Sequence, residues 1–211
     1  MIISYHGAEC FKISQGDLTL ALNPISKDSQ LKPTRFGADI TLITTKDVDF
    51  NGREQTSRGD KESFVIDGPG EYEIKDVFIK GFLSAGPNLP AGKAGKKMNT
   101  IYLISFEGMN LCFLGALKDP ALPTETLEAI EDIDILFVPI GGGEVLDSAS
   151  AYKLAVSLEP SIIIPMHYTK ATLEQFLKEG GEAKTESLDK FVVKKKDLEG
   201  KEGEIVVLKE E

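Results

Sequence analysis

Short β-prone runs, each closed by turn-forming residues, most constrain what this chain can fold into. In the first half these runs are Ile2–His6, Cys10–Ser14 and Leu18–Leu22, and they are separated by Gly7-Ala8-Glu9 and Gln15-Gly16-Asp17. Runs of this length with turn residues between them predict an antiparallel meander. We therefore expect the first half of the chain to be rich in strands.

Two further pairs of runs predict hairpins, because two turn-forming residues separate the members of each pair. They are Glu71–Ile74 with Val77–Lys80 around Lys75-Asp76, and Thr100–Phe106 with Asn110–Leu114 around Glu107-Gly108. The run Ala38–Thr44 is almost continuously apolar, which predicts a strand buried on both faces. Later strands are expected at Ile162–Ile164, Phe191–Val193 and Glu204–Leu208.

Three helices are expected in the second half. Thr124 is placed to cap the first, and Asp147 precedes a second helix that Pro160 ends. The third stops at Gly180-Gly181, where a left-handed cap is easily formed. Strand-rich halves that each end in β–α units predict an α/β fold, with two sheets face to face and helices outside. No linker divides the chain, so we expect one domain over residues 1–211.

The segment Ser84–Lys97, SAGPNLPAGKAGKK, is rich in glycine, proline and lysine. This composition predicts a mobile loop. Lys93, Lys96 and Lys97 could clamp a phosphate from such a loop, but a solvated loop is the alternative interpretation.

Composition and charge exclude several classes of function. The net charge is −10, with 34 acidic against 24 basic residues, which repels a nucleic-acid backbone. The longest apolar runs, such as Ile133–Ile140, are too short to span a bilayer. The first residues contain no secretory signal pattern. Cys10 and Cys112 each lie in an apolar run without metal or redox spacing. Two buried thiols in the cytoplasm are therefore expected.

Several segments resemble proteins of the metallo-β-lactamase fold, in the branch that includes sugar-phosphate lactonase-like hydrolases. The matching segments are Tyr5-His6-Gly7-Ala8-Glu9-Cys10-Phe11, Ile66-Asp67-Gly68-Pro69-Gly70-Glu71-Tyr72-Glu73, Leu114-Gly115, Val138-Pro139-Ile140-Gly141-Gly142-Gly143 with Asp147, and Ile164-Pro165-Met166-His167-Tyr168. They occur in the family's order and cover nearly the whole chain. The resemblance implies a four-layer αββα sandwich with its site at one edge of the two sheets. It also implies hydrolysis assisted by one or two divalent ions, usually zinc.

The resemblance also shows that most ligand positions of the family are lost in this chain. The family takes its ligands from a His-x-His-x-Asp-His loop after a buried strand, a later histidine, an aspartate after a Leu-Gly pair, and a final histidine. Here these positions read Thr45, Asp47, Asp49 and Phe50 in the loop, then Gly86, Ala116 and His167. Only Asp49 and His167 keep the expected residue type. Because His6 and His167 are the chain's only histidines, no shift of alignment restores the site.

The preferred hypothesis is a non-catalytic homologue of zinc-dependent hydrolases, with a binding, structural or regulatory role and no cofactor. The alternative is a hydrolase of a phosphoester or lactone with a weak site made of Asp47, Asp49 and His167. Two carboxylates and one imidazole suit Mg²⁺ or Mn²⁺ better than Zn²⁺, and a Lys46 ammonium nearby would repel either. In the alternative, Asp49 would be the catalytic residue.

Each remaining candidate has a purely structural interpretation. His167 could hydrogen-bond a carbonyl at the sheet edge, Asp49 could cap a turn, and Asp147 could cap its helix. His6 does not match a ligand position and is interpreted as structural. A third hypothesis is an anion-binding module, in which the backbone of Gly141, Gly142 and Gly143 and the lysine loop bind a small anionic ligand. The sequence indicates no oligomeric state and no macromolecular partner.

Overall fold

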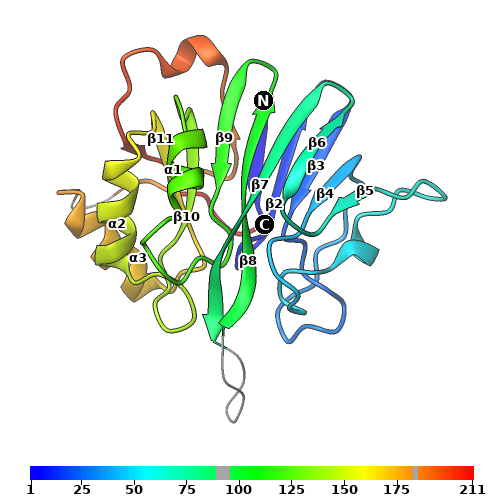
Figure 1. Ribbon diagram of the computed structural model, residues 1–211, viewed down its shortest axis with the longest axis horizontal. Coiled ribbons are helices and arrows are strands. Elements are labelled where there is room, and N and C mark those ends of the chain that lie inside the picture. Colours follow the sequence, from blue (N-terminus) through cyan, green and yellow to red (C-terminus); the bar gives the residue numbers. More distant parts are fainter. Residues whose placement is uncertain (89–95, 183–184) are drawn as a thin grey trace.

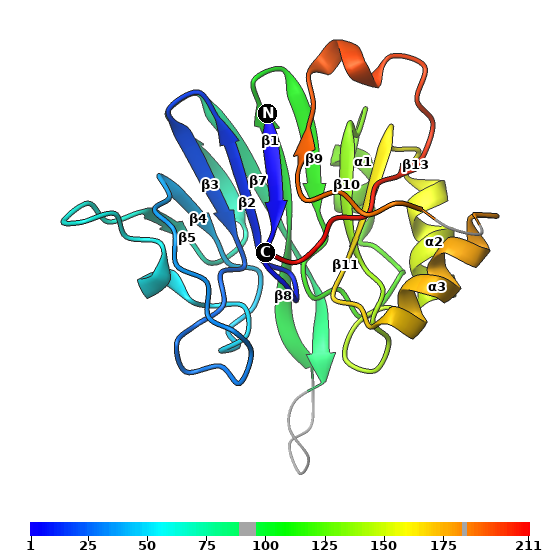
Figure 2. The same ribbon diagram turned by 180° about the vertical axis from the view of Figure 1, so that it is seen from behind.

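The computed structural model describes residues 1–88, 96–182 and 185–211, in which two sheets pack face to face (Figures 1 and 2). The first sheet has the order β12-β1-β2-β3-β4-β5. Its strands are β12 (Phe191–Val192), β1 (Ile2–Tyr5), β2 (Phe11–Gln15), β3 (Leu18–Leu22), β4 (Ile40–Leu42) and β5 (Phe64–Ile66). Pairing is antiparallel from β12 to β3 and parallel from β3 to β5. The predicted meander is confirmed, whereas the run Ala38–Thr44 forms only the three-residue strand β4.

The second sheet has the order β13-β11-β10-β9-β8-β7-β6. Its strands are β13 (Glu204–Ile205), β11 (Ile162–Met166), β10 (Ile135–Pro139), β9 (Met109–Phe113), β8 (Lys96–Phe106), β7 (Val77–Asn88) and β6 (Gly70–Ile74). Strands β13, β11, β10 and β9 pair in parallel, and β9, β8, β7 and β6 pair antiparallel. Parallel pairing places the carboxyl ends of β9, β10 and β11 at the same edge of this sheet.

Both predicted hairpins are confirmed, but the segment predicted as a loop between β7 and β8 is strand at both ends, and its middle, residues 89–95, lies outside the described residues. The turns at Lys75-Asp76 and Glu107-Gly108 have positive φ at both residues, as a two-residue hairpin requires. Strand β7 continues to Asn88 and β8 already begins at Lys96, so both ends of Ser84–Lys97 are strand rather than mobile loop. Cross-strand pairing outweighs the low strand propensity of glycine and proline here.

The α-helices of the described residues, α1 (Thr124–Ala129), α2 (Ser148–Ser157) and α3 (Lys170–Glu179), all cover the outer face of the second sheet (Figure 1). Asp147 caps α2 as predicted, accepting a hydrogen bond from the Ser150 N–H at 2.9 Å. Thr124 does not cap α1. It is the first residue of that helix, and Pro123 precedes it without a side-chain cap. None of the helices in these residues is long and apolar enough to cross a membrane.

The outer face of the first sheet carries irregular chain in place of the expected helical layer. The segment around Phe36 and the end of the short 3-10 helix η1 (Arg53–Gln55) contact this face. The Phe36 ring lies against the Lys12 ammonium, and Thr41 shares hydroxyl hydrogen bonds with Thr56 and Ser63. The strands present short polar side chains on this face, which favours such contacts over an apolar helix interface. The two-sheet sandwich is confirmed, with α-helices on one side of the described chain.

Two hydrophobic layers hold the sandwich together. The layer between the sheets contains Phe11, Phe113 and Phe137, which meet edge to face with ring centroids 4.8 to 6.5 Å apart. The layer between the second sheet and the helices contains Leu136, Phe176 and their neighbours. Burying aromatic rings in edge-to-face contact stabilises the core beyond the burial of their area.

Segments far apart in sequence close both sheets. Strand β12 pairs with β1, and the amino group of Met1 donates to the carbonyl of Val193, 192 positions later. After β13 the chain passes from the second sheet to the first, where Glu210 pairs with Tyr5. A second 3-10 helix, η2 (Lys195–Leu198), lies between β12 and β13. The two ends of the described chain therefore contribute to the same sheet edge.

Candidate functional site

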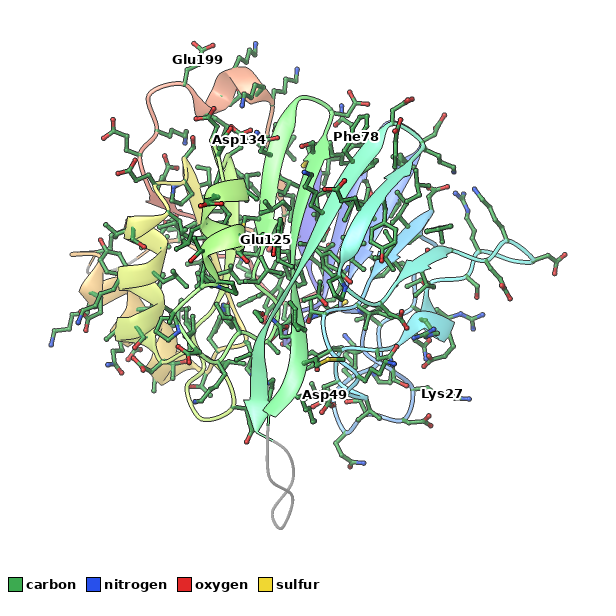
Figure 3. The ribbon with its side chains drawn as sticks, viewed as in Figure 1. Lys27, Asp49, Phe78, Glu125, Asp134 and Glu199 are labelled. Atoms are coloured by element: carbon green, nitrogen blue, oxygen red, sulfur yellow. The ribbon has the colours of Figure 1, made fainter. Side chains whose placement is uncertain are left out.

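The candidate site lies at the edge where the carboxyl ends of β4, β9, β10 and β11 meet, which is the usual position of ligands in α/β sheets. It lies beside the end of β7 and the start of β8, with the loop that carries Asp49 on one side (Figure 3). Asp134 and Glu199 are at the opposite end of the molecule in the same view. Two hydrogen bonds from β8 fix the chain where this loop begins: the Tyr102 hydroxyl donates to the Ile43 carbonyl and the Thr100 N–H donates to the Thr44 carbonyl.

Local hydrogen bonds fold the loop after β4 into tight turns. The Asp47 carboxylate accepts a hydrogen bond from the Asp49 N–H at 3.1 Å, as in an Asx turn. The Phe50 N–H donates to the Asp47 carbonyl at 3.0 Å. The Asp49 carboxylate accepts a hydrogen bond from the Ser29 hydroxyl. The carboxylate that caps this turn is therefore that of Asp47, whereas the Asp49 carboxylate joins the loop to Ser29 in a different segment.

Asp47 is paired with Lys97 of β8. The Lys97 ammonium donates to the free oxygen of the Asp47 carboxylate, and both side chains are about three-quarters buried. Burial acts to raise the pKa of Asp47, but the Lys97 contact and the N–H groups of Asp49 and Val48 hold that pKa below its ordinary value. The positive charge beside the site is thus Lys97, whereas Lys46 is exposed.

An apolar cluster contains two of the positions to which the resemblance assigns metal ligands. Phe50, Ala116 and Val145 are buried against one another, with Ala8 packed beside them. The Phe50 ring also contacts the His167 imidazole, with centroids 5.7 Å apart. Phe50 and Ala116 stand at a histidine and an aspartate position of the resemblance. These two losses therefore form one packed contact, which we call the apolar plug (Ala8, Phe50, Ala116 and Val145).

His167 is held by a carboxylate rather than by the carbonyl that its structural interpretation predicts. Its Nδ1 lies 3.0 Å from Oε1 of Glu9, which is inaccessible to solvent. The other oxygen of Glu9 accepts a hydrogen bond from the Asn23 amide, which also donates to the Thr44 hydroxyl. The backbone N–H of His167 donates to the Ala8 carbonyl, and the backbone of His167 has a φ of 53°. The sequence did not predict Glu9 or Asn23 as site residues, because only the fold brings them to His167.

The environment of His167 favours its protonated form. Burial acts to lower its pKa, but the hydrogen bond and charge of Glu9, with the charges of Asp49 and Glu144, raise the pKa above its ordinary value. A negative neighbour favours a cation, so this sign is expected.

The donor set does not fit a zinc centre. Within the described ranges, no group of three or more His, Cys, Asp or Glu side chains is arranged to hold a metal ion. The three candidate metal ligands are hydrogen-bonded to other side chains. The Asp47 carboxylate bonds Lys97, the Asp49 carboxylate bonds Ser29, and Nδ1 of His167 bonds Glu9. A catalytic zinc site needs three convergent ligands and an open position. The apolar plug provides neither.

The glycine turn after β10 positions His167 and has internal contacts of its own. A Cβ at Gly141 would lie 2.2 Å from the His167 carbonyl oxygen, so only glycine fits there. The Gly142 N–H donates to the Leu146 carbonyl, and the Lys118 ammonium donates to the Gly143 carbonyl. At least one of the backbone donors proposed for an anion is therefore already used.

The lysines proposed for the same anion are not assembled by the described residues. Lys97 is bound to Asp47. Lys93 lies outside the described residues, and the side chain of Lys96 does as well. Asp147 places a carboxylate at the N-terminus of α2, where an anion would have bound. The described part of the chain does not bring together the predicted anion-binding set.

The comparisons with known proteins agree on one family. A family model described as "Beta-lactamase superfamily domain" matches residues 2–167. A UPF0173 metal-dependent hydrolase from Thermoplasma acidophilum is 25% identical over 191 residues, covering 79% of this chain and 82% of that protein. Another from Natranaerobius thermophilus is 24% identical over 205 residues, covering 85% and 90%.

Solved structures show the same similarity. A candidate Zn-dependent hydrolase of the metallo-β-lactamase superfamily from Thermotoga maritima superposes with a TM-score of 0.77 and 26% identity, covering 98% of this chain and 97% of that one. A metal-dependent hydrolase candidate from Parabacteroides distasonis has a TM-score of 0.67 at 15% identity, covering 98% and 91%, and supports the fold alone.

Proposed function

This chain belongs to the beta-lactamase superfamily, and from that membership we propose that it is a non-catalytic homologue of the metal-dependent hydrolases, with a binding, structural or regulatory role. One observation carries the proposal. Two of the positions to which the resemblance assigns metal ligands, Phe50 and Ala116, belong to the apolar plug, whose Phe50, Ala116 and Val145 are at most 5% exposed. A hydrolytic centre needs an open, polar position for water and substrate. The plug leaves an aromatic ring against the one retained histidine.

Two finer features of the proposal rest on the same residues. We propose that the chain lies nearest to the sugar-phosphate lactonase-like branch, because its five motifs follow that branch in order. We also propose a cytoplasmic location. Burial raises the pKa of both the Cys10 and the Cys112 thiol to about 12, which keeps them as unreactive thiols.

A second candidate function is a metal-dependent hydrolase with a weak site at Asp47, Asp49 and His167. The names of the relatives favour this candidate over the first, since they are metal-dependent hydrolases. One feature of the structure also favours it. Metal-binding histidines usually give their other ring nitrogen to a carboxylate, and Glu9 holds Nδ1 of His167 in this way. Nε2 is then the nitrogen available to a ligand.

Metal content and metal response distinguish the two candidates. The protein is purified without added metal, analysed for Zn, Mn and Fe, and melted with and without each divalent ion, alongside His167→Asn. His6→Asn is the matched control, because His6 stacks on Phe36 outside the site. The non-catalytic proposal expects far less than one ion per chain and the same melting temperature with and without metal.

The second candidate expects added Mn²⁺ or Mg²⁺ to raise the melting temperature of the wild type and of His6→Asn, but not that of His167→Asn, and to support turnover. About one zinc ion per chain, lost in His167→Asn but kept in His6→Asn, would contradict the non-catalytic proposal. Turnover of a lactone or phosphoester panel by the wild type, abolished by Asp49→Asn, would contradict it independently.

A further inference from the structure

We propose that Lys97 is an internal cation that replaces the metal ion, by holding the Asp47 loop to the β7–β8 hairpin and keeping a divalent cation out. This inference deepens the proposed function and rests on it. The Lys97–Asp47 pair would hold together, without an ion, two segments that the fold normally joins through a bound ion.

The position of Lys97 connects it with the lost ligands. Lys97 lies at the start of β8, opposite the end of β7 that contains Gly86, the position where the family has a histidine. A Cβ at Gly86 would lie 2.9 Å from the Lys97 carbonyl oxygen, so the two residues are direct cross-strand neighbours. The hairpin that would supply a histidine to the ion instead supplies an ammonium group.

The partner of Lys97 is also a former ligand position. Asp47 stands where the family's loop has its second histidine, and its carboxylate accepts the hydrogen bond from Lys97, 50 positions away in sequence. The contact joins the loop of the first sheet to a hairpin of the second sheet. A metal ion bound between the same two segments would make the same connection.

Burial distinguishes this ion pair from the exposed pairs of the molecule. The side chains of Lys97 and Asp47 are 25% and 24% exposed, whereas those of Lys80 on β7 and Glu71 on β6 are 55% and 76% exposed. Exposed pairs contribute little to stability, because water and salt screen them. Removing one partner of a protected pair leaves a charge without compensation.

The same charge disfavours a metal ion. Coulomb repulsion between an ammonium group and a divalent cation a few ångströms away is substantial near a protein surface. Lys97 also occupies the oxygen of Asp47 that is not used in the turn with Asp49. Replacing Lys97 with a neutral residue of similar length should therefore weaken the fold and at the same time leave Asp47 open to a cation.

The test compares Lys97→Met with Lys80→Met by thermal melting in EDTA and in millimolar Mn²⁺ or Zn²⁺. In EDTA, Lys97→Met should melt about 2–4 °C below the wild type, a shift typical of a modest loss in a domain of this size. Lys80→Met should melt close to the wild type. Millimolar Mn²⁺ should raise the melting temperature of Lys97→Met, but not that of the wild type, Lys80→Met or the double variant Lys97→Met/Asp47→Asn.

One further variant, Lys97→Arg, keeps the result decisive. Lys97→Arg preserves the charge and should melt close to the wild type, so if Lys97→Met fails to fold while Lys97→Arg folds, the role of the charge is supported. A Lys97→Met protein that melts like the wild type and ignores metal overturns this inference alone. A wild type that holds stoichiometric zinc overturns the proposed function, and this inference with it.

Discussion

His167 and Glu9 form a contact whose contribution to stability depends on pH. Glu9 has no solvent-exposed surface, and it lies 3.0 Å from Nδ1 of His167. Burial of the imidazole opposes its protonation, but the adjacent carboxylate outweighs burial and raises the pKa of His167 above 6.5. A histidine of this kind binds its proton more tightly in the folded than in the unfolded chain.

We therefore expect the His167 contact to stabilise the fold most in mild acid. Its contribution is fully present below the unfolded pKa of 6.5 and is lost as the pH rises through the higher folded pKa. The measurement is the free energy of unfolding of the wild type and of His167→Gln, by denaturant titration over a series of pH values. The difference between the two proteins should shrink as pH rises.

His6 supplies an internal control of opposite sign. Burial lowers the pKa of His6, so the unfolded chain binds its proton more tightly and this residue costs stability in acid. The difference between wild type and His6→Gln should change with pH in the opposite direction. Parallel trends for the two variants would contradict this assignment of the pKa shifts.

Among the candidate site residues, the resemblance indicates which positions lack a ligand residue type but not which contacts those positions make. The absence of histidine at Phe50 and of aspartate at Ala116 follows directly from the resemblance and the composition. That the two residues pack together as one plug does not, because their contact joins loops from different sheets. Glu9 and Lys97 were missed as partners of His167 and Asp47 for the same reason. A charged residue carries no signal in its local sequence for a partner that is distant along the chain.

Element boundaries depend on caps that local sequence only partly predicts. Asp147 accepts a hydrogen bond from the Ser150 N–H and begins α2 where predicted. Thr124 has a residue type suited to the same role, yet it is the first residue of α1. A cap needs an extended backbone as well as a suitable side chain. Asp147 has this backbone, with φ −74° and ψ 161°.

Removing the cap of α2 should weaken the whole domain. Asp147→Ala is expected to lower the free energy of unfolding by about 1 kcal/mol, because the N–H of Ser150 loses its partner. Asp147→Asn retains a capping oxygen and should lose only a few tenths of a kcal/mol by comparison. Urea titration at neutral pH measures both variants. Equal losses would show that the carboxylate charge, and not the hydrogen bond, stabilises the helix.

The hairpin of β7 and β8 shows where propensity fails at the element scale. Glycine and proline between Ser84 and Lys97 predict a loop, but pairing with the opposite strand extends both strands into that segment. The pairing shifts register between Ala85 and Asn88, which accommodates the irregular sequence. Pairing between β7 and β8, and not the local residue types, therefore determines how far the two strands extend.

At the scale of the whole molecule, Tyr102 links the two sheets by a buried hydrogen bond. Its side chain is fully buried, and its hydroxyl donates to the Ile43 carbonyl at 2.9 Å. Tyr102→Phe should lower the free energy of unfolding by about 1 kcal/mol. Tyr72→Phe is the matched control, because the Tyr72 hydroxyl makes only longer contacts of 3.3 Å at a more exposed position. A smaller loss in Tyr102→Phe than in the control would contradict this role.

The overall architecture followed from strand spacing and motif order, but one layer did not. Two sheets and the helices after β9 were predicted, because apolar periodicity gives both. The chain over the first sheet was expected to be helical. Pro24 and Pro33 disfavour helix in that segment, and the hydroxyl contacts of Thr41 replace an apolar interface.

The pairing of β1 with β12 has a consequence for how the protein is made. Strand β1 is synthesised well before its neighbour β12, since the Met1–Val193 bond joins residues 192 positions apart. While the residues between them are synthesised, that edge of β1 has no partner, and an unpaired strand edge is a site for mispairing between nascent chains. This sheet can be completed only once β12 has left the ribosome, so slow elongation between the two strands lengthens the time during which β1 is open to aggregation.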